Sequence, residues 1–361
     1  IPSLLLLTYP FHNEGVVWLL GRGASMSCTF ALVGMIMMLS HYTLLKRILL
    51  TCSCYFIGLL AFESIIFYPF IILILLLIKG IKRKERILWV SGLLITLCIH
   101  LIIRFRISGS LTGSYGSGFL KGEPAIYLLN IVKTAGRLIF PPTGKWHWLA
   151  FVYIAILAIF GILFLQIVRP RSIRPSMKVI KGLWLCLCIS CIIPVFTGVS
   201  TITSESDRML YFPSVFLCMM FSMLLIFFFR NAFGKLLICL LMLSYNIFFL
   251  EKNNLHWAVA GATTQSLIRL IKNNPHGKTY VLDTPEEYRG AFIFRQGLND
   301  ALRINSIDSS NITVVNYLTR DQVDLPPIST IAQTLPALNK DDEVIFWNRK
   351  TFVTLKITPK N

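Results

Sequence analysis

Charged residues are scarce in this sequence. Asp, Glu, Lys and Arg make up 14% of the 361 residues, whereas a typical soluble domain contains about 25%. Together with a hydrophobic content of 55%, this deficit excludes an ordinary soluble enzyme and a disordered or collagen-like chain. The composition is typical of a membrane protein that crosses the bilayer several times.

Acidic residues are the scarcer of the two signs of charge, and they are unevenly distributed. Residues 1–250 contain 22 basic and 6 acidic residues, whereas residues 251–361 contain 13 and 11. The basic excess therefore belongs to the hydrophobic part, where Lys and Arg in loops set the orientation of the spans. It gives no reason to expect nucleic acid as a partner.

Cysteine is missing after residue 250. The nine cysteines lie in apolar runs without His or further Cys at zinc spacing, so we expect no disulfide framework. The Gly- and Ser-rich residues 109–118 lack the Gly-Lys-Ser/Thr of a nucleotide P-loop. The sequence also begins at Ile1 inside an apolar run, without a signal peptide, and we expect a fragment whose N-terminal part is absent.

Long apolar runs dominate the first 250 residues, and residues 1–9 look like the tail of one more. The connecting segments alternate between a set with 14 bases and one acid and a set with five of the six acids. The positive-inside rule places the basic set in the cytoplasm and residues 105–145, 200–210 and 251–361 on the outer side. The expected spans are 25–44, 48–62, 65–78, 87–103, 147–168, 182–199, 211–229 and 234–250.

The run from residue 48 to residue 78 requires a turn. A single helix of this length would span about 46 Å, whereas the hydrocarbon core is roughly 30 Å thick. A hairpin that turns near Glu63 keeps Lys46 and the 82–86 basic cluster on one side. Because its arms are short, we expect Glu63 at membrane depth or in an outward-facing cavity.

Residues 125–140 predict an interfacial amphipathic helix, with Leu128 and Leu129 on its apolar side and Lys133 and Arg137 on the other. Both simple anchoring and a lipid-phosphate clamp are open for these two cations. Residues 251–361 predict a small α/β domain. Its expected helices are 258–272 and 288–302, and its expected strands are 279–282, 312–317, 343–347 and 352–357.

Three polar clusters fall in the segments assigned to the outer side. Ionisable groups at membrane depth cost roughly 2.5–3.5 kcal/mol each, so they are retained where they face a cavity, pair or bind a ligand. Glu14 and Arg22 are eight residues apart and would share one face of a single helix. The candidate substrate-binding residues are His12, Glu14, Arg22, Glu63, Asp207, Arg208 and Tyr211.

Each cluster also has a simpler interpretation. His12 and Glu14 are too few ligands for more than a weak metal signal. Glu14 and Arg22 could be interfacial loop charges, and Glu63 could mark a mere turn. Asp207 and Arg208 could form a local ion pair at a helix start. The remaining histidines sit singly and receive no role: His41, His100, His147, His256 and His276.

The order of these clusters resembles the GT-C membrane glycosyltransferases, in the branch of the transmembrane TPR-repeat O-mannosyltransferases and their bacterial relatives. Residues 9–22 (Tyr-Pro-Phe-His-Asn-Glu-Gly-Val-Val-Trp-Leu-Leu-Gly-Arg) resemble the family's His-Pro-x-His-x-Glu pattern, which ends in Gly-Arg. Residues 207–214 (Asp-Arg-Met-Leu-Tyr-Phe-Pro-Ser) resemble its Glu-Arg-x-Leu-Tyr-Leu-Pro-Ser. Residues 61–63 resemble a Ser-Lys-Glu motif, and residues 288–295 resemble the tail of some bacterial members.

This chain departs from the family at Tyr9, where the family has His, and at Phe62, where it has Lys, and no TPR repeats follow. The resemblance implies a polyprenyl-phosphate-linked sugar donor, an outward-facing site and an inverting transfer. It also implies a catalytic acid in the first outer loop, upstream of the residues present here. The catalytic residue is therefore unknown.

For such a donor, we expect Arg22 or Arg208 to neutralise the phosphate leaving group by charge-assisted bonds. We expect Glu14 or Glu63 to orient hydroxyls of the donor or the acceptor. The implied partners are a lipid-linked sugar, an acceptor protein or glycan, and membrane lipids. The sequence establishes no cofactor, and a divalent metal is left open. We expect an all-α membrane bundle of GT-C type in a bacterial inner membrane, with a C-terminal α/β domain outside the cytoplasm. A polysaccharide polymerase, ligase or flippase is the alternative, and a transporter is a third.

Overall fold

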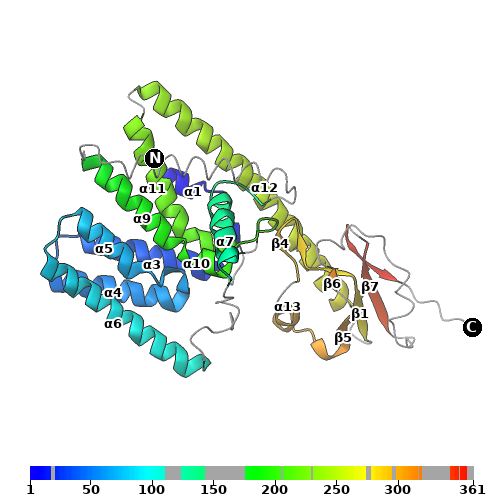
Figure 1. The fold of residues 1–361 in the computed structure, drawn as a ribbon. Helices are drawn as coiled ribbons and strands as arrows, with labels where there is room; N and C mark the ends of the chain where they lie inside the picture. The colour runs from blue at the N-terminus through cyan, green and yellow to red at the C-terminus, as the bar shows by residue number, and fades with distance from the viewer. Residues whose placement is uncertain are drawn as a thin grey trace, which may run out of the picture. The chain divides into compact units, whose positions relative to one another are not determined.

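The structure is a computed structural model in which the chain divides into two compact units, Ile1–Glu251 and Lys252–Asn361 (Figure 1). Within the described residues, six helices are long and apolar enough to span a membrane, which fits a multi-pass integral membrane protein. The described residues are 1–17, 21–109, 123–142, 175–204, 206–228, 231–273, 278–294, 298–315, 317–318, 342–348 and 350–355.

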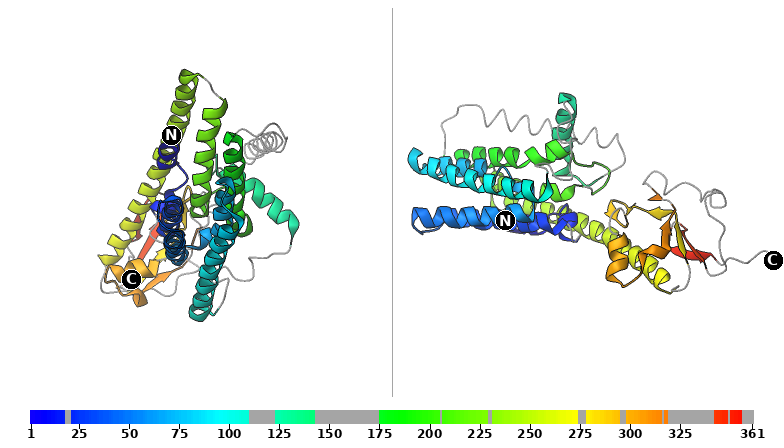
Figure 2. Two further views of the ribbon diagram at one scale, coloured as in Figure 1. Left: turned by 90° about the vertical axis from the view of Figure 1, so that its left-hand side faces the viewer. Right: turned by 90° about the horizontal axis from the view of Figure 1, so that it is seen from below.

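The first unit is a helical bundle. Helix α3 packs on α4, α4 and α5 pack on α6, and α9 packs on both α5 and α11, which also contacts α1 (Figure 2). The bounds are α1 (Pro2–Leu7), α2 (Asn13–Val16), α3 (Arg22–Leu39), α4 (Leu44–Ala61), η2 (Glu63–Ile65), α5 (Tyr68–Ile78), α6 (Arg83–Ser108), α7 (Pro124–Arg137), α9 (Pro175–Ser190), α10 (Ile192–Thr197), η5 (Asp207–Leu210) and α11 (Tyr211–Phe228). Helix α12 (Ala232–Lys272) begins in this unit, and its residues from Lys252 on belong to the second.

The predicted turn near Glu63 is confirmed. Helix α4 ends because Phe62 adopts an extended backbone, and α5 begins with Pro69 in its first turn, where a missing N–H costs nothing. Gly80, in the left-handed conformation, follows α5. Since α3 to α6 alternate in direction, the basic loops after α3 and after α5 lie at one end of the bundle and Glu63 lies at the other.

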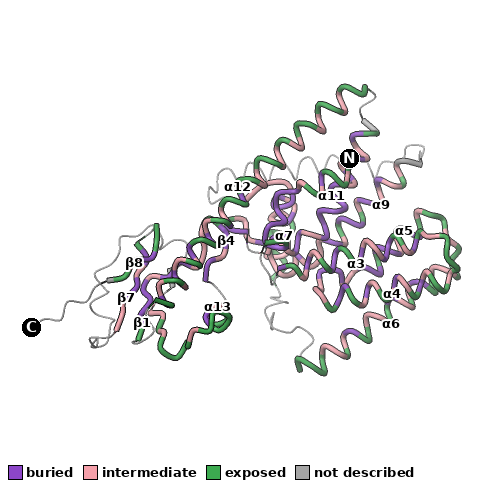
Figure 3. The backbone as a smooth tube through the Cα atoms, turned by 180° about the vertical axis from the view of Figure 1, so that it is seen from behind, coloured by how far each residue is buried: buried purple, intermediate pink, exposed green. Residues whose placement is uncertain are grey.

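Most expected spans are helical, and the expected span 147–168 lies outside the described residues. One boundary prediction was wrong. The expected span 234–250 and the expected helix 258–272 are a single helix, α12, because residues 251–257 contain neither Pro nor Gly to interrupt it. Between residues 231 and 250, side chains are exposed or half-buried, whereas those of α11 are mostly buried (Figure 3).

Helix α7 matches the expected amphipathic segment, but its polar side faces the bundle. Asn130, Thr134 and Arg137 are buried, whereas Leu128 and Leu129 are exposed. Asn130 donates a hydrogen bond from Nδ2 to the Val195 carbonyl of α10 at 2.9 Å. An apolar side that faces outward suits a helix in contact with lipid.

The second unit contains a sheet with the strand order β5-β1-β7-β8. Strand β1 (Thr279–Leu282) is parallel to β5 (Ile312–Val314) and to β7 (Glu343–Trp347), while β8 (Phe352–Leu355) is antiparallel to β7. The smaller elements are β2 (Thr284–Pro285), β3 (Glu287–Tyr288), β4 (Ala291–Phe292), β6 (Tyr317–Leu318), α13 (Leu298–Ile304) and η6 (Ser309–Asn311).

The predicted helix 288–302 was wrong over its first half. Arg289 and Gly290 both have positive φ, so they form a tight turn that joins β3 to β4 as a hairpin. A helix begins only at Leu298. The predicted strand 312–317 divides into β5 and β6, which pair with different partners.

Candidate functional site

Two segments that lie about two hundred residues apart in sequence interlock at the end of the bundle opposite the basic loops. The His12 ring stacks on Tyr211, with centroids 3.9 Å apart and planes 18° apart. His12 Nε2 lies 2.7 Å from Ser214 Oγ, and that hydroxyl donates to the Tyr211 carbonyl at 2.7 Å. Since the Ser214 proton is engaged, the His12 Nε2–H is the donor to Ser214 Oγ.

Burial fixes the charge state of His12. Desolvation lowers the pKa of His12 to about 3, so the imidazole is neutral near neutral pH. The ring centroids of Tyr9 and His12 lie 4.6 Å apart. The Tyr9 hydroxyl donates a hydrogen bond to the Leu138 carbonyl at 2.8 Å. His12 therefore acts as a neutral donor that joins two segments.

Glu14 is almost fully buried and holds the start of η5 and α11. Its Oε2 accepts a hydrogen bond from the backbone N–H of Arg208 at 2.9 Å. Its Oε1 lies 3.8 Å from Arg208 Nε, a charge attraction that is longer than a hydrogen bond. The side chain of Arg208 is 24% exposed and that of Glu14 is 2% exposed, so the cation reaches the surface and the anion does not.

Two glycines permit this close approach. A Cβ on Gly21 would lie 1.9 Å from the Glu14 carbonyl oxygen, and one on Gly15 would lie 3.1 Å from the Tyr211 ring. The first distance is a severe clash with backbone, so position 21 must remain glycine for Glu14 to keep its place.

The simpler interpretation, a local ion pair between Asp207 and Arg208, does not hold. Asp207 forms a buried ion pair with Arg137 of α7, and Arg208 faces Glu14 instead. Arg137 also donates to the Ser200 carbonyl at 3.1 Å and to the Phe140 carbonyl at 2.6 Å. Several charge-assisted bonds thus satisfy the guanidinium in the interior. We call His12, Glu14, Arg137, Asp207 and Arg208 the interlocked cluster.

Arg137 is the residue of this cluster that the sequence reasoning missed. It was placed on the polar side of an interfacial helix with Lys133, yet its exposed fraction is 0%. A signal was present, because a buried Asp207 in an acid-poor bundle requires a cation close by.

Arg22 begins α3 and does not share a helix with Glu14. Helix α2 ends at Val16, and the guanidinium of Arg22 donates from Nε to the Val16 carbonyl at 3.1 Å. The expectation of a single helical face was therefore wrong. Arg22 is exposed, and its neighbour Gly23 packs against the Ala61 carbonyl at the end of α4.

The basic partner of Glu63 is neither Arg22 nor Arg208. Glu63 forms an ion pair with Arg104 of α6. His100, one turn earlier on α6, places Nε2 at 3.9 Å from Glu63 Oε1. We call Glu63, His100 and Arg104 the corner cluster. His100 had received no role because it sits alone in sequence, four residues before Arg104.

A metal centre has little support. His12 and Glu14 are committed to Ser214 and Arg208. No group of three or more His, Cys, Asp and Glu side chains suited to a metal ion occurs in the described part of the chain. The chemistry available in both clusters is charge pairing and hydrogen bonding.

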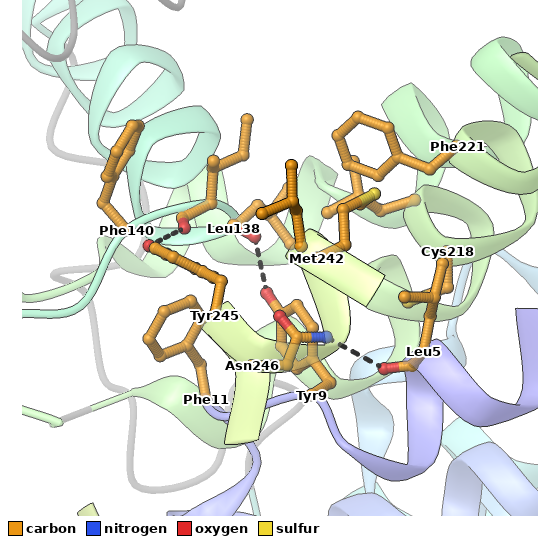
Figure 4. A pocket seen from close by; sticks show the side chains of 13 residues that line it. Leu5, Tyr9, Phe11, Leu138, Phe140, Cys218, Phe221, Met242, Tyr245 and Asn246 are labelled. Atoms are coloured by element: carbon orange, nitrogen blue, oxygen red, sulfur yellow. Dashed lines mark hydrogen bonds between the residues drawn. The ribbon is translucent and has the colours of Figure 1, made fainter. Parts of the chain in front are cut away.

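An apolar cavity of about 330 Å³ adjoins the interlocked cluster (Figure 4). Its polar lining groups are engaged with the protein: the hydroxyls of Tyr9 and Tyr245 donate to the Leu138 and Ile139 carbonyls. Its surface therefore suits hydrocarbon. The lining residues are Leu5, Tyr9, Phe11, Leu138, Ile139, Phe140, Leu217, Cys218, Phe221, Leu241, Met242, Tyr245 and Asn246.

A scan against protein-family models, a search of curated proteins and a search of solved structures found no match to this chain. The case for any function therefore depends on the motifs at residues 9–22 and 207–214 and on the contacts that join them.

Proposed function

We propose that this protein is a GT-C type glycosyltransferase, which transfers a sugar from a polyprenyl-phosphate-linked donor to a protein or glycan at the outer face of a membrane. The observation that carries this proposal is the contact between the two motifs. His12 meets Ser214 and Tyr211, and Glu14 meets Arg208, so the residues that carry the resemblance form one unit.

The position of the apolar cavity supports a lipid-linked donor. Tyr9 and Phe11 line the cavity. The Tyr9 ring contacts that of His12, and the Arg137 guanidinium lies 5.3 Å from the Phe11 ring centroid. A ligand with a charged head and a hydrocarbon tail matches a polar cluster that adjoins an apolar cavity.

Within this proposal, Arg208 binds the donor phosphate. Its guanidinium is partly exposed, whereas Glu14 and Asp207 are buried. A phosphate on the exposed side gains charge-assisted hydrogen bonds, and these strengthen as the leaving group takes up negative charge. Glu14 orients Arg208 through the backbone N–H. The catalytic acid belongs to the loop that the resemblance places upstream.

The experiment that tests this role compares Arg208→Ala, Arg208→Lys and the control Arg83→Ala. Arg83 lies at the start of α6, at the end of the bundle with the basic loops, and it is exposed. Transfer from radiolabelled polyprenyl-phosphate sugars is measured in membranes, together with protein abundance.

Arg208→Ala should lower transfer at least ten-fold at wild-type abundance, about 1.4 kcal/mol in transition-state terms. Lys should restore only part of it, because it lacks the planar fork. Arg83→Ala should match wild type. Equal transfer by Arg208→Ala and wild type would contradict the phosphate role. Equal losses of abundance and transfer would also contradict it and would indicate a structural ion pair.

We propose from the positive-inside rule that the loops after α3 and α5 lie in the cytoplasm and that the C-terminal unit lies outside it. The resemblance favours a bacterial inner membrane. A cysteine introduced at the exposed Ser309 should react with a membrane-impermeant maleimide from outside. One introduced at the exposed Lys82 should react only after the membrane is permeabilised. Labelling of Lys82→Cys in intact cells would reverse the orientation.

A further inference from the structure

His100 has an unusual environment for a side chain inside a membrane bundle. Its side chain is 7% exposed, and within the described parts of the chain neither ring nitrogen has a hydrogen-bond partner. Each buried polar atom left without a partner costs about 1–3 kcal/mol. The position is therefore unfavourable unless another molecule supplies a donor and an acceptor.

The three side chains of the corner cluster differ in how far the described residues bury them. The exposed fraction of the side chain rises from 7% at His100 to 17% at Arg104 and 33% at Glu63. His100 thus lies deepest, and the ion pair forms the accessible rim. A ligand that enters past the rim meets a carboxylate that accepts hydrogen bonds, a guanidinium that donates them and an imidazole.

The hydrogen-bonding capacity of these three groups selects among ligands. A neutral imidazole offers one donor and one acceptor, a carboxylate only accepts and a guanidinium only donates. A hydroxyl group both donates and accepts, so neighbouring hydroxyls can satisfy all three. A phosphate without protons only accepts, and it would meet the carboxylate of Glu63 with like charge. A hydrocarbon chain satisfies none of them.

We propose that the corner cluster is a subsite for sugar hydroxyl groups, in which His100 forms the floor and Glu63 and Arg104 form the rim. This inference rests on the proposed function for its place in catalysis. Phe62 connects the two clusters: its ring centroid lies 5.8 Å from the Arg208 guanidinium, and the next residue is Glu63. A sugar held at the corner would therefore lie near the cation that we assign to the donor phosphate.

The first experiment measures binding of methyl glycosides of glucose, galactose, mannose and N-acetylglucosamine to the purified full chain in nanodiscs by ligand-observed NMR. Inorganic phosphate serves as the anionic probe. The variants are His100→Phe, Glu63→Gln and Arg104→Gln. The matched control is Arg106→Gln, because Arg106 is exposed on the same helix.

We expect at least one glycoside to bind the wild type and Arg106→Gln equally. The same glycoside should bind each cluster variant at least ten-fold more weakly, a loss of about 1.4 kcal/mol. Phosphate should show no dependence on these residues. The absence of glycoside binding to the wild type would overturn the proposal. So would unchanged affinity in His100→Phe together with higher thermal stability, which would indicate an ordered water at His100.

The sugar can come from the donor or from the acceptor, and a second arm distinguishes the two. It compares the affinities of polyprenyl-phosphate sugars and of the polyprenyl phosphate without a sugar. If the hydroxyls belong to the donor, His100→Phe weakens binding of the lipids that carry a sugar and leaves binding of the lipid without a sugar unchanged. If they belong to the acceptor, His100→Phe weakens methyl glycosides and leaves both lipids unchanged.

Failure of the subsite and failure of the proposed function give different results. Lipid binding that is lost in Arg208→Ala, together with glycoside binding that is indifferent to His100→Phe, overturns only the subsite. Glycoside binding that depends on His100, together with lipid binding that is indifferent to Arg208→Ala, supports the subsite and contradicts the donor phosphate role.

Discussion

Two of the carboxylate–arginine pairs in the described part of this bundle, Arg137–Asp207 and Arg104–Glu63, share their chemistry and differ in burial. The side chains of Arg137 and Asp207 are 1% and 3% exposed, whereas those of Arg104 and Glu63 are 17% and 33% exposed. A fully buried pair is committed to the fold, because the loss of one member leaves a charge without solvent or partner. A partly exposed pair contributes less to the stability of the fold, and a ligand can reach it.

The largest effect that this comparison predicts is at Arg137. Arg137→Met should destabilise the bundle by about 3–5 kcal/mol, because Asp207 would remain as a buried, unpaired charge. Folded protein is measured after mild detergent extraction by size-exclusion chromatography with heating. The control is Lys133→Met, one turn earlier on α7 and only half-buried, which should stay near wild type.

A double variant sharpens this prediction. Arg137→Met combined with Asp207→Leu removes both charges and should recover much of the lost stability. Recovery should be partial, because the bonds from Arg137 to the Ser200 and Phe140 carbonyls are also lost. A double variant no more stable than Arg137→Met would show that the buried charge of Asp207 is not the cause.

The hairpin and the buried ion pair show what the sequence can and cannot predict. The turn near Glu63 was predictable, because helix length, membrane thickness and the position of basic loops leave few alternatives. The ion-pair partners of Asp207 and Arg208 were not predictable from the sequence. Asp207 and Arg208 are neighbours in sequence, yet they pair with Arg137 and Glu14, which tertiary contacts bring to them.

Helix α7 explains one further error. Its amphipathic pattern was predictable, but the direction of its polar side was not. In a soluble protein the apolar side of a helix faces the core, whereas beside a bilayer it can face lipid and the polar side can face the protein. The pattern alone does not distinguish these cases, so the burial of Arg137 was not predicted.

The next prediction concerns His12 and the pH dependence of stability. The pKa of His12 is about 3 in the folded chain, and an unfolded chain has an ordinary value of about 6.5. The unfolded state therefore binds the proton first, and stability falls as the pH falls from about 6.5 toward 3. The loss from this residue should reach about 2 kcal/mol by pH 5.

His12→Phe tests the sign of this effect. Phe keeps an aromatic ring against Tyr211 and cannot be protonated, so the variant should lose less stability than the wild type between pH 7.5 and pH 5. At pH 7.5 it should be less stable, because the bond to Ser214 is lost. The thermal midpoint is measured at both pH values. Identical pH slopes for the two proteins would contradict a buried, neutral His12.

The smallest expected effect on stability is at Glu63, where the pair is only partly buried. Glu63→Gln keeps the shape of the side chain and should change stability by less than about 1 kcal/mol. Sugar transfer should nevertheless fall ten-fold or more, about 1.4 kcal/mol in transition-state terms, because Gln cannot hold Arg104 by charge and binds hydroxyls less strongly. The control is Glu123→Gln at the exposed start of α7, which should leave both quantities unchanged. A large loss of stability at Glu63 with proportionate loss of transfer would make this pair structural, like that of Arg137 and Asp207, and would remove the contrast between them.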